Sequence, residues 1–285
     1  MLKVRFHPLL LLVFFLFIAL DQVGQFFILF FIVTIHEWIH IFVAKRLKLN
    51  CNTWHLLPVG QAALLPDLEF QSPGVQTLIL LSGPLCNLII GWVGSFFVQP
   101  TYLYLKFFVF TNMAIGFFNL LPIYPLDGSQ VLYGWIAHYK GNLWAMKQIL
   151  KISQNCLWIL RILGFIQMIL YPMNASLLFI WAYLSYVNQR TKLYGTYELY
   201  KMIKRKELYR EERGGRGSAF CRLVSRHTSL TKILQGFSAS RQDVFIVQDS
   251  YKEQPTIIME PLLLNYMMEV NLEGTIQDYL DQEKG

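Results

Sequence analysis

Apolar runs long enough to cross a lipid bilayer dominate the first two thirds of this 285-residue chain. A transmembrane helix needs about 20 apolar residues, with a range near 17 to 25. We expect about six spans, the first, fifth and sixth of them short: Phe6–Leu20, Gly24–Ala44, Val75–Val98, Tyr102–Leu121, Leu157–Leu170 and Ala175–Tyr186. Since no internal repeat accompanies them, the sequence predicts a polytopic α-helical membrane protein without paired halves.

The composition divides the chain into parts. Hydrophobic residues make up 54% of it and charged residues 15%, whereas an ordinary soluble domain is about one quarter charged. Charged residues become frequent only after Gln189. We therefore predict a transmembrane domain over residues 1–190, a basic juxtamembrane linker helix over 191–215 and a small cytoplasmic domain over 216–285.

The basic residues indicate how the chain crosses the membrane. The net charge is +7, but Lys and Arg lie beside apolar segments and form no nucleic-acid-binding module, so we expect no direct nucleic-acid partner. Lys and Arg favour cytoplasmic loops, and three predicted turns contain neither residue: 21–23, 99–101 and 171–174. These turns should lie outside, which makes the protein multi-pass with both termini cytoplasmic. The first run also resembles a signal peptide, but it is not followed by a small-residue cleavage site.

A metal-binding pattern lies inside the second apolar run. His36-Glu37-Trp38-Ile39-His40 places two histidines at i and i+4, on one face of a helix, where both can hold one metal ion. Glu37 follows the first histidine and can accept a proton from an attacking water. Ionisable residues in a membrane helix are costly and are functional by default. The alternative is a buried polar cluster satisfied by neighbouring groups.

A third ligand is expected because catalytic zinc usually has three protein ligands. Asp127 follows the interrupted segment Asn119 to Leu126, in which Pro122 and Pro125 break the helix near the end of the fourth span. Irregular backbone at membrane depth is tolerated only where it lines a cavity or is packed against protein, and the same holds for the backbone that carries this carboxylate. Asp127 is our choice; the alternative is an ordinary turn in which Asp127 caps the next helix. Five other candidates lie in predicted loops: His7, His55, Asp67, Glu69 and His138.

The sequence resembles the site-2 protease family of intramembrane zinc metalloproteases. Three segments carry the resemblance: the H-E-x-x-H span, the segment Asn119 to Gly128 with its L-D-G end, and a G-P-x-x-N turn matched by Gly83 to Asn87. The resemblance implies one Zn²⁺ per chain, held by His36, His40 and Asp127, with Glu37 as the catalytic base. It further implies that Asn119, Pro122 and Pro125 position the substrate.

The layout is most similar to the sporulation branch of that family. This branch is implied to cleave a membrane-associated sigma-factor precursor, in the mother-cell membrane around the forespore, under the control of inhibitory membrane partner proteins. Another substrate, such as an anti-sigma factor, is an alternative. The proline-containing stretch from Asn50 to Ser72 predicts short strands or a re-entrant loop, to which an unwound substrate could add as a strand.

The C-terminal region predicts a small α+β domain. Strands are expected at Ala219–Val224, Asp243–Gln248 and Pro255–Met259, with helices from Ser229 to Phe237 and from Pro261 to Val270. This order looks like one cystathionine-beta-synthase (CBS) repeat, a module that commonly binds adenine nucleotides such as ATP. A lone repeat should pair with a second copy, so we expect at least a dimer; the alternative is a docking domain without nucleotide.

Two other function classes compete with the protease. A metal or proton transporter also places His and acidic residues in membrane helices, but it predicts paired halves. A non-catalytic membrane scaffold has no need of Glu37. Glu37→Gln separates the three, because only the protease should lose its activity. The four cysteines contain no C-x-x-C pair, so they indicate neither a zinc knuckle nor a disulfide framework.

Overall fold

The computed structural model describes most of the chain, in two compact units. The units are Met1–Leu132 and Tyr133–Gly285, and their boundary falls inside helix α5, Asp127–Lys140. The described residues are 3–6, 9–49, 53–57, 60–65, 67–98, 101–172, 174–192, 206, 219–248, 255–269 and 274–284.

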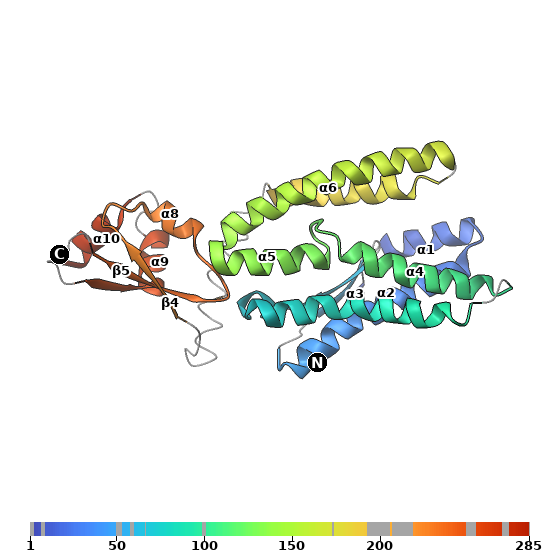
Figure 1. Cartoon of the computed structure of the whole chain (residues 1–285), viewed down its shortest axis with the longest axis horizontal. Coiled ribbons are helices and arrows are strands. Elements are labelled where there is room, and N and C mark those ends of the chain that lie inside the picture. The colour runs from blue at the N-terminus through green and yellow to red at the C-terminus, as the bar shows by residue number, and fades with distance from the viewer. Residues whose placement is uncertain are drawn as a thin grey trace. The chain divides into compact units, whose positions relative to one another are not determined.

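Four helices form most of the first unit: α1 Leu9–Ala19, α2 Val23–Arg46, α3 Pro73–Ser95 and α4 Leu103–Asn119. Helix α3 packs on both α2 and α4 (Figure 1). A Cβ at Gly91 would lie 2.7 Å from Met113 Cγ, and one at Gly116 would lie 2.8 Å from Leu88 Cγ. Glycines at these crossings let α3 and α4 approach closely, as is typical of helix pairs in membranes.

A three-stranded sheet accompanies these helices. Its order is β1 Lys3–Phe6, β2 Thr53–Leu57 and β3 Gly60–Leu64, with β1 parallel and β3 antiparallel to β2. The strands expected between Asn50 and Ser72 are confirmed, and a short 3₁₀ helix, Leu68–Phe70, follows them. The prediction that the first span begins at Phe6 is wrong, because Lys3–Phe6 pairs with a strand 50 residues later.

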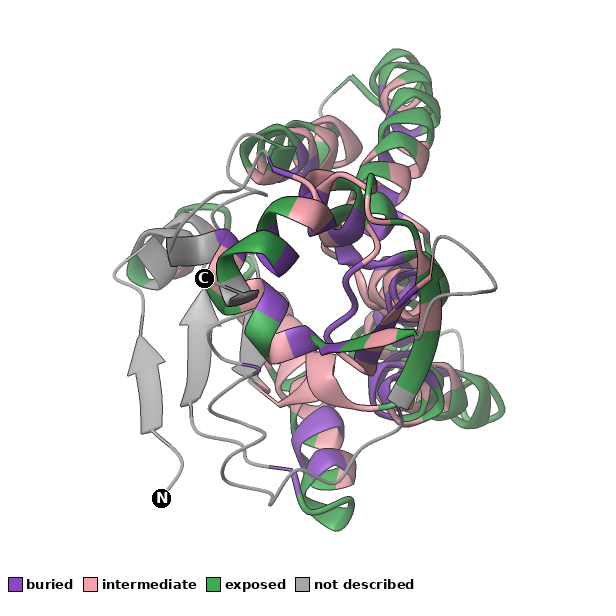
Figure 2. Ribbon diagram, turned by 90° about the vertical axis from the view of Figure 1, so that its left-hand side faces the viewer, coloured by how far each residue is buried: buried purple, intermediate pink, exposed green. Residues whose placement is uncertain are grey.

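Three helices among the described residues are long and apolar enough to cross a membrane: α2, α3 and α6, Asn142–Leu170. Helices α1 and α4 are shorter, with 11 and 17 residues. Large apolar side chains are exposed on these helices, and Figure 2 shows exposed residues along their outer faces. Soluble monomers rarely expose so much apolar surface, and these faces are therefore suited to contact lipid. The chain is a membrane protein with at least these three candidate spans.

Helix α6 is the first of two helices that pack side by side in the second unit. It has 29 residues and begins at Asn142, so the prediction of a span starting at Leu157 placed its beginning too late. Residues 142–156 contain no proline or glycine, and their lysines do not interrupt a helix. A further helix over residues 176–192 runs back beside α6 (Figure 1). The two pack closely, because a Cβ at Gly164 would lie 2.8 Å from Leu178 Cδ2.

The C-terminal region has the predicted order of strand, helix, strand, strand and helix. Its elements are β4 Ala219–Val224, α8 Leu230–Gln235, β5 Gln242–Val247, β6 Thr256–Met259 and α9 Glu260–Glu269, followed by an unpredicted helix, α10 Ile276–Lys284. Strand β5 is central, parallel to β4 and antiparallel to β6. Leu230, Phe245, Leu263 and Ile276 form the centre of its core. The predicted helix over Tyr194–Glu212 lies outside the described residues, except for Lys206.

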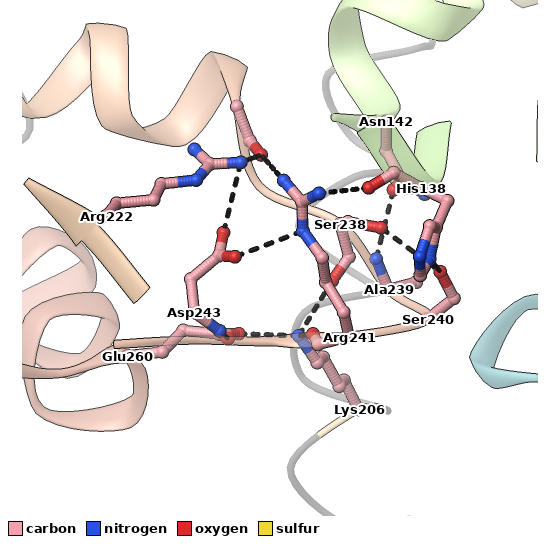
Figure 3. Close-up of polar contacts among 11 residues, drawn as sticks. His138, Asn142, Lys206, Arg222, Ser238, Ala239, Ser240, Arg241, Asp243 and Glu260 are labelled. Atoms are coloured by element: carbon pink, nitrogen blue, oxygen red, sulfur yellow. Dashed lines mark hydrogen bonds and ion pairs between the residues drawn. The ribbon is translucent and has the colours of Figure 1, made fainter. Parts of the chain in front are cut away.

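Buried polar contacts join the start of α6 to this C-terminal domain (Figure 3). Asn142 N donates to Phe237 O at 2.7 Å, and Asn142 Oδ1 accepts from Ala239 N at 3.0 Å. Arg241 donates to the carbonyl of His138, at the end of α5. Two of these three contacts require a particular side chain, that of Asn142 or of Arg241, so the junction depends on side-chain identity as well as on chain conformation.

Charged side chains surround the same junction. Lys206 Nζ lies 2.6 Å from Glu260 Oε1 and also donates to the carbonyls of Ser238 and Arg241. Asp243 lies between Arg222 and Arg241, with N–O distances of 3.4 and 3.1 Å. Buried charges are tolerated only when paired, so each of these charges requires its partner in the folded domain.

Candidate metal centre

Helix α2 places the two histidines of the H-E-x-x-H pattern. It contains no proline and runs without interruption from Val23 to Arg46, so His36 and His40 stand one turn apart on its buried face. They are 4% and 5% exposed, whereas Glu37 is half-buried. The predicted pair therefore points into protein and away from lipid.

A short irregular segment places the carboxylate. Helix α4 ends at Asn119, and α5 begins at Asp127, with Pro122 and Pro125 between them. A Cβ at Gly128 would collide with the carbonyl of Leu120, so only glycine allows the chain to return this closely past the end of α4. The close return places Asp127 at the first residue of α5.

The three predicted ligands meet. His36 Nε2 lies 3.1 Å from Asp127 Oδ2, His40 Nε2 lies 3.4 Å from the same oxygen, and the two Nε2 atoms are 3.2 Å apart. Tetrahedral zinc with N and O ligands at about 2.0–2.1 Å requires ligand atoms roughly 3.3 Å apart. The donor set and its spacing therefore fit a zinc ion, and it is the one such cluster among the described residues.

The remaining ring nitrogens have protein partners on α3. His40 Nδ1 donates to the carbonyl of Ile79 at 2.7 Å, which leaves its Nε2 free to bind a metal. His36 Nδ1 lies 3.2 Å from the carboxamide nitrogen of Asn87, which is fully buried. Contacts from α3 at Nδ1 thus fix the orientation of both imidazole rings.

Gly83 explains how α3 comes so close to the ligands. A Cβ at this position would lie 2.7 Å from His40 Cε1 and 2.9 Å from His36 Cε1. The segment Gly83 to Asn87 is not the turn that the sequence predicts, because α3 runs straight through it with Pro84 inside the helix. Its glycine makes room for the imidazoles, and its asparagine contacts one of them.

Other candidates lie elsewhere. Asp67, Glu69 and His138 are outside the ligand cluster, and the side chains of His7 and His55 are outside the described residues. Asn119 Nδ2 donates to Ile115 O within its own helix, at 3.0 Å. The carbonyl of Pro125 accepts from Gln130 Nε2 at 2.8 Å, and Pro122 is half-buried. The contacts of Ile79 and Asn87 with the histidines were missed, although a buried Asn in an apolar helix is itself a signal.

Comparisons with known proteins agree with this geometry. Residues 94–163, which include Asp127, match the model of peptidase family M50. A zinc metalloprotease of Methanocaldococcus jannaschii is 27% identical over 190 residues, 64% of this chain and 54% of that protein. Stage IV sporulation protein FB of Bacillus subtilis is 27% identical over 135 residues, 46% of this chain and 47% of that protein.

A solved structure matches as well. The site-2 protease from Methanocaldococcus jannaschii superimposes with a TM-score of 0.53 at 25% identity, covering 66% of this chain and 90% of that one. The chain spans about half the length of the two relatives matched by sequence.

Proposed function

We propose that this chain belongs to peptidase family M50, the site-2 protease family, and is a zinc metalloendopeptidase that hydrolyses peptide bonds within the membrane. The observation that carries the proposal is the triangle of His36, His40 and Asp127, whose two histidines are buried on α2, a helix of membrane-spanning character. Three protein ligands with room for a fourth are typical of catalytic zinc sites, whereas structural sites are closed by four.

The chain's own residues account for the chemistry. A zinc ion held by this triangle would polarise the scissile carbonyl and lower the pKa of a water molecule toward about 7. Glu37 follows His36 on α2 and is only half-buried, so its carboxylate can accept the proton of the attacking water and pass it to the leaving amine. His40 is oriented by Ile79 O, and the ring therefore keeps its position during the reaction.

The substrate must be unwound, because the carbonyl of a helical peptide bond is already hydrogen-bonded within its own helix. Strand β3 is at the edge of its sheet and contacts α2, the helix that carries the histidines. We infer that the substrate adds to this edge as a strand. We propose that the segment beside Asp127 is held in the conformation that receives the substrate by Asn119, Pro122 and Pro125.

A metal or proton transporter is the competing function. It would use the same ligands but would not need a base beside His36. The experiment is proteolysis of a membrane-associated candidate substrate by wild type and by Glu37→Gln, each with and without a zinc chelator. Cleavage that requires both Glu37 and zinc supports the protease, whereas ion transport that survives Glu37→Gln supports the transporter.

The substrate is proposed to be a sigma-factor precursor, and the mother-cell membrane around the forespore its location. The similarity to a sporulation protein of Bacillus subtilis supports this choice. Co-expression with membrane-associated sigma-factor precursors should give a shorter, chelator-sensitive product, and cleavage of an anti-sigma factor alone would favour the alternative. Inhibitory membrane partners would reduce the product when added to the same cells.

The membrane topology is proposed to comprise six spans with both termini cytoplasmic. Its support is the absence of Lys and Arg from the three predicted outer turns. Reporter fusions after Gln22, Pro100 and Met173 should all report the outer side of the membrane. A cytoplasmic signal from any of them would show that the number of spans is wrong.

The C-terminal domain is proposed to be a CBS-like module that pairs between two chains and responds to ATP. Two features support the proposal: the succession of β5, β6 and α9, and the presence of one such module in the part of the chain that the structure describes. We keep the limits 1–190, 191–215 and 216–285 for the three parts. Cleavage by the full chain and by a chain stopped near Arg213, each with and without ATP, tests the idea. An identical ATP response in both would exclude the C-terminal domain as the sensor.

A further inference from the structure

Asn87 contacts a ligand histidine from inside the membrane domain. It lies in the middle of α3, is fully buried, and its carboxamide nitrogen is 3.2 Å from His36 Nδ1. The amide oxygen, Oδ1, has no hydrogen-bond partner in the part of the chain that the structure describes. A buried amide oxygen without a partner is rare, so its presence beside the metal centre requires an explanation.

The protonation of His36 supplies the explanation. Its Nε2 faces Asp127 Oδ2 and His40 Nε2, and this nitrogen can bind a metal only when it carries no proton. The proton of the neutral ring must then be on Nδ1, which needs an acceptor. The carboxamide nitrogen of Asn87 is only a donor, and as a donor to Nδ1 it would require the proton on Nε2, the wrong tautomer for a ligand.

Rotation of the Asn87 carboxamide by 180° gives a partner both to the amide oxygen and to a proton on His36 Nδ1. It exchanges the amide nitrogen and oxygen without moving any other atom. Oδ1 then accepts the proton of His36 Nδ1, and the unsatisfied oxygen gains its partner. His40 needs no such device, because the backbone carbonyl of Ile79 already accepts the proton of its Nδ1 at 2.7 Å.

We propose that Asn87 is a positioning residue that selects the metal-binding tautomer of His36 by accepting its Nδ1 proton. The two histidines are thus fixed differently: His40 by the backbone of α3, and His36 by a side chain that substitution can remove. The proposal rests on the proposed zinc site and deepens it by assigning a role to a residue outside the ligand set.

Zinc affinity of the purified full-length chain, measured by competition with a chelator, tests the proposal. Asn87→Leu removes the acceptor at similar volume and should weaken zinc binding about 10- to 100-fold, as loss of a hydrogen-bond partner of a ligand does. Asn87→Asp keeps an acceptor and should bind zinc within a few-fold of wild type. Asn112→Leu is the matched control, because Asn112 is a buried asparagine whose Nδ2 donates to Phe108 O in its own helix, α4.

The ranking of the variants separates positioning from a merely structural role. In a buried membrane helix leucine is better tolerated than aspartate, so a structural role predicts more intact protein and more zinc in Asn87→Leu than in Asn87→Asp. The proposal predicts the opposite order for zinc affinity. If the leucine variant is poorly recovered, Asn87→Ala removes the acceptor without adding bulk and should show the same loss.

Two failures remain distinguishable. Wild-type zinc affinity in Asn87→Leu or Asn87→Ala would overturn the role of Asn87, as would an equal loss in Asn87→Asp. A zinc-loaded wild-type chain that cleaves no peptide would overturn the protease, while the order of zinc affinities would still decide the role of Asn87.

Discussion

His36 Nε2 lies 3.1 Å from Asp127 Oδ2, although 91 positions separate the two residues in the chain. The contact joins the middle of α2 to the first residue of α5. A metal site with three ligands needs residues from both of these segments. The centre therefore depends on how α2, α3 and the segment after α4 pack together.

Glu37→Gln should abolish proteolysis while zinc content stays near one per chain. The amide cannot accept a proton, and loss of a general base costs about 10²- to 10⁴-fold in rate. Cleavage and metal content of the purified variant provide the measurement. Asp21→Asn makes the same carboxylate-to-amide change in an exposed turn and should leave both quantities unchanged. Cleavage by Glu37→Gln at more than a tenth of the wild-type rate would contradict the assignment.

Gly83→Ala should displace the histidines. The added methyl would lie 2.9 Å from His36 Cε1 and closer still to His40, and a shift of about 1 Å in a catalytic centre costs about 10²-fold in activity. Zinc content should fall together with the rate of cleavage. Gly74→Ala is the matched control in the same helix, because a Cβ there meets nothing within 4 Å. Equal zinc content in the two variants would contradict the prediction, because it would show that α3 can shift at Gly83 to accommodate the added methyl group.

Lys206→Met should destabilise the C-terminal domain by about 3–5 kcal/mol, the usual cost of leaving a buried charge without its partner. Glu260 is 2% exposed and would lose the ammonium at 2.6 Å. Burial raises the pKa of Glu260, and Lys206 opposes that rise. Limited proteolysis across a urea series measures the loss of stability.

The control for this prediction is Lys232→Met on the exposed face of α8, which should change little. Adding Glu260→Gln to Lys206→Met removes the uncompensated charge and keeps an acceptor for Asp243 N, so it should recover part of the loss. A double variant no more stable than Lys206→Met would mean that the lysine acts through its bonds to carbonyls instead.

Asp278→Asn should weaken α10 in a pH-dependent manner. The backbone N–H and hydroxyl of Thr275 donate to Asp278 Oδ2 at 2.6 and 3.0 Å, and these bonds lower the pKa of Asp278 below its ordinary value. The carboxylate therefore contributes stability above the ordinary pKa of 3.8, and the contribution is lost as pH falls through the lowered pKa. Thermal unfolding midpoints of wild type and variant should differ at pH 7 and converge near pH 2. A constant difference would contradict the prediction.

Local patterns predicted the parts of the site that depend on one helix. The spacing of His36 and His40 places them on one face whatever surrounds them, and α2 confirms the helix. The proline and glycine residues near Asp127 predicted the irregular segment, because their effect on the backbone is also local. In the C-terminal domain, alternating apolar residues predicted β4, β5 and β6 to within one residue of their observed limits.

Features that depend on distant partners could not be predicted in this way. Lys3–Phe6 becomes a strand only because Thr53 and its neighbours pair with it, and alone it resembles the charged flank of a span. Asn87 is one polar residue in an apolar run until α3 packs beside His36. Helix α10 has few apolar residues, and Ile276, which is fully buried, is stabilised by a core that the rest of the domain supplies.

The separation of the ligands along the chain is also a separation in time. At about 5–20 residues per second of synthesis, Asp127 is added roughly 5 to 18 s after His36. Until then the nascent chain holds two histidines and a glutamate but no complete centre. The proposed zinc site therefore has only two of its three ligands during this first part of synthesis, and a chain at this stage would lack the complete centre that catalysis requires.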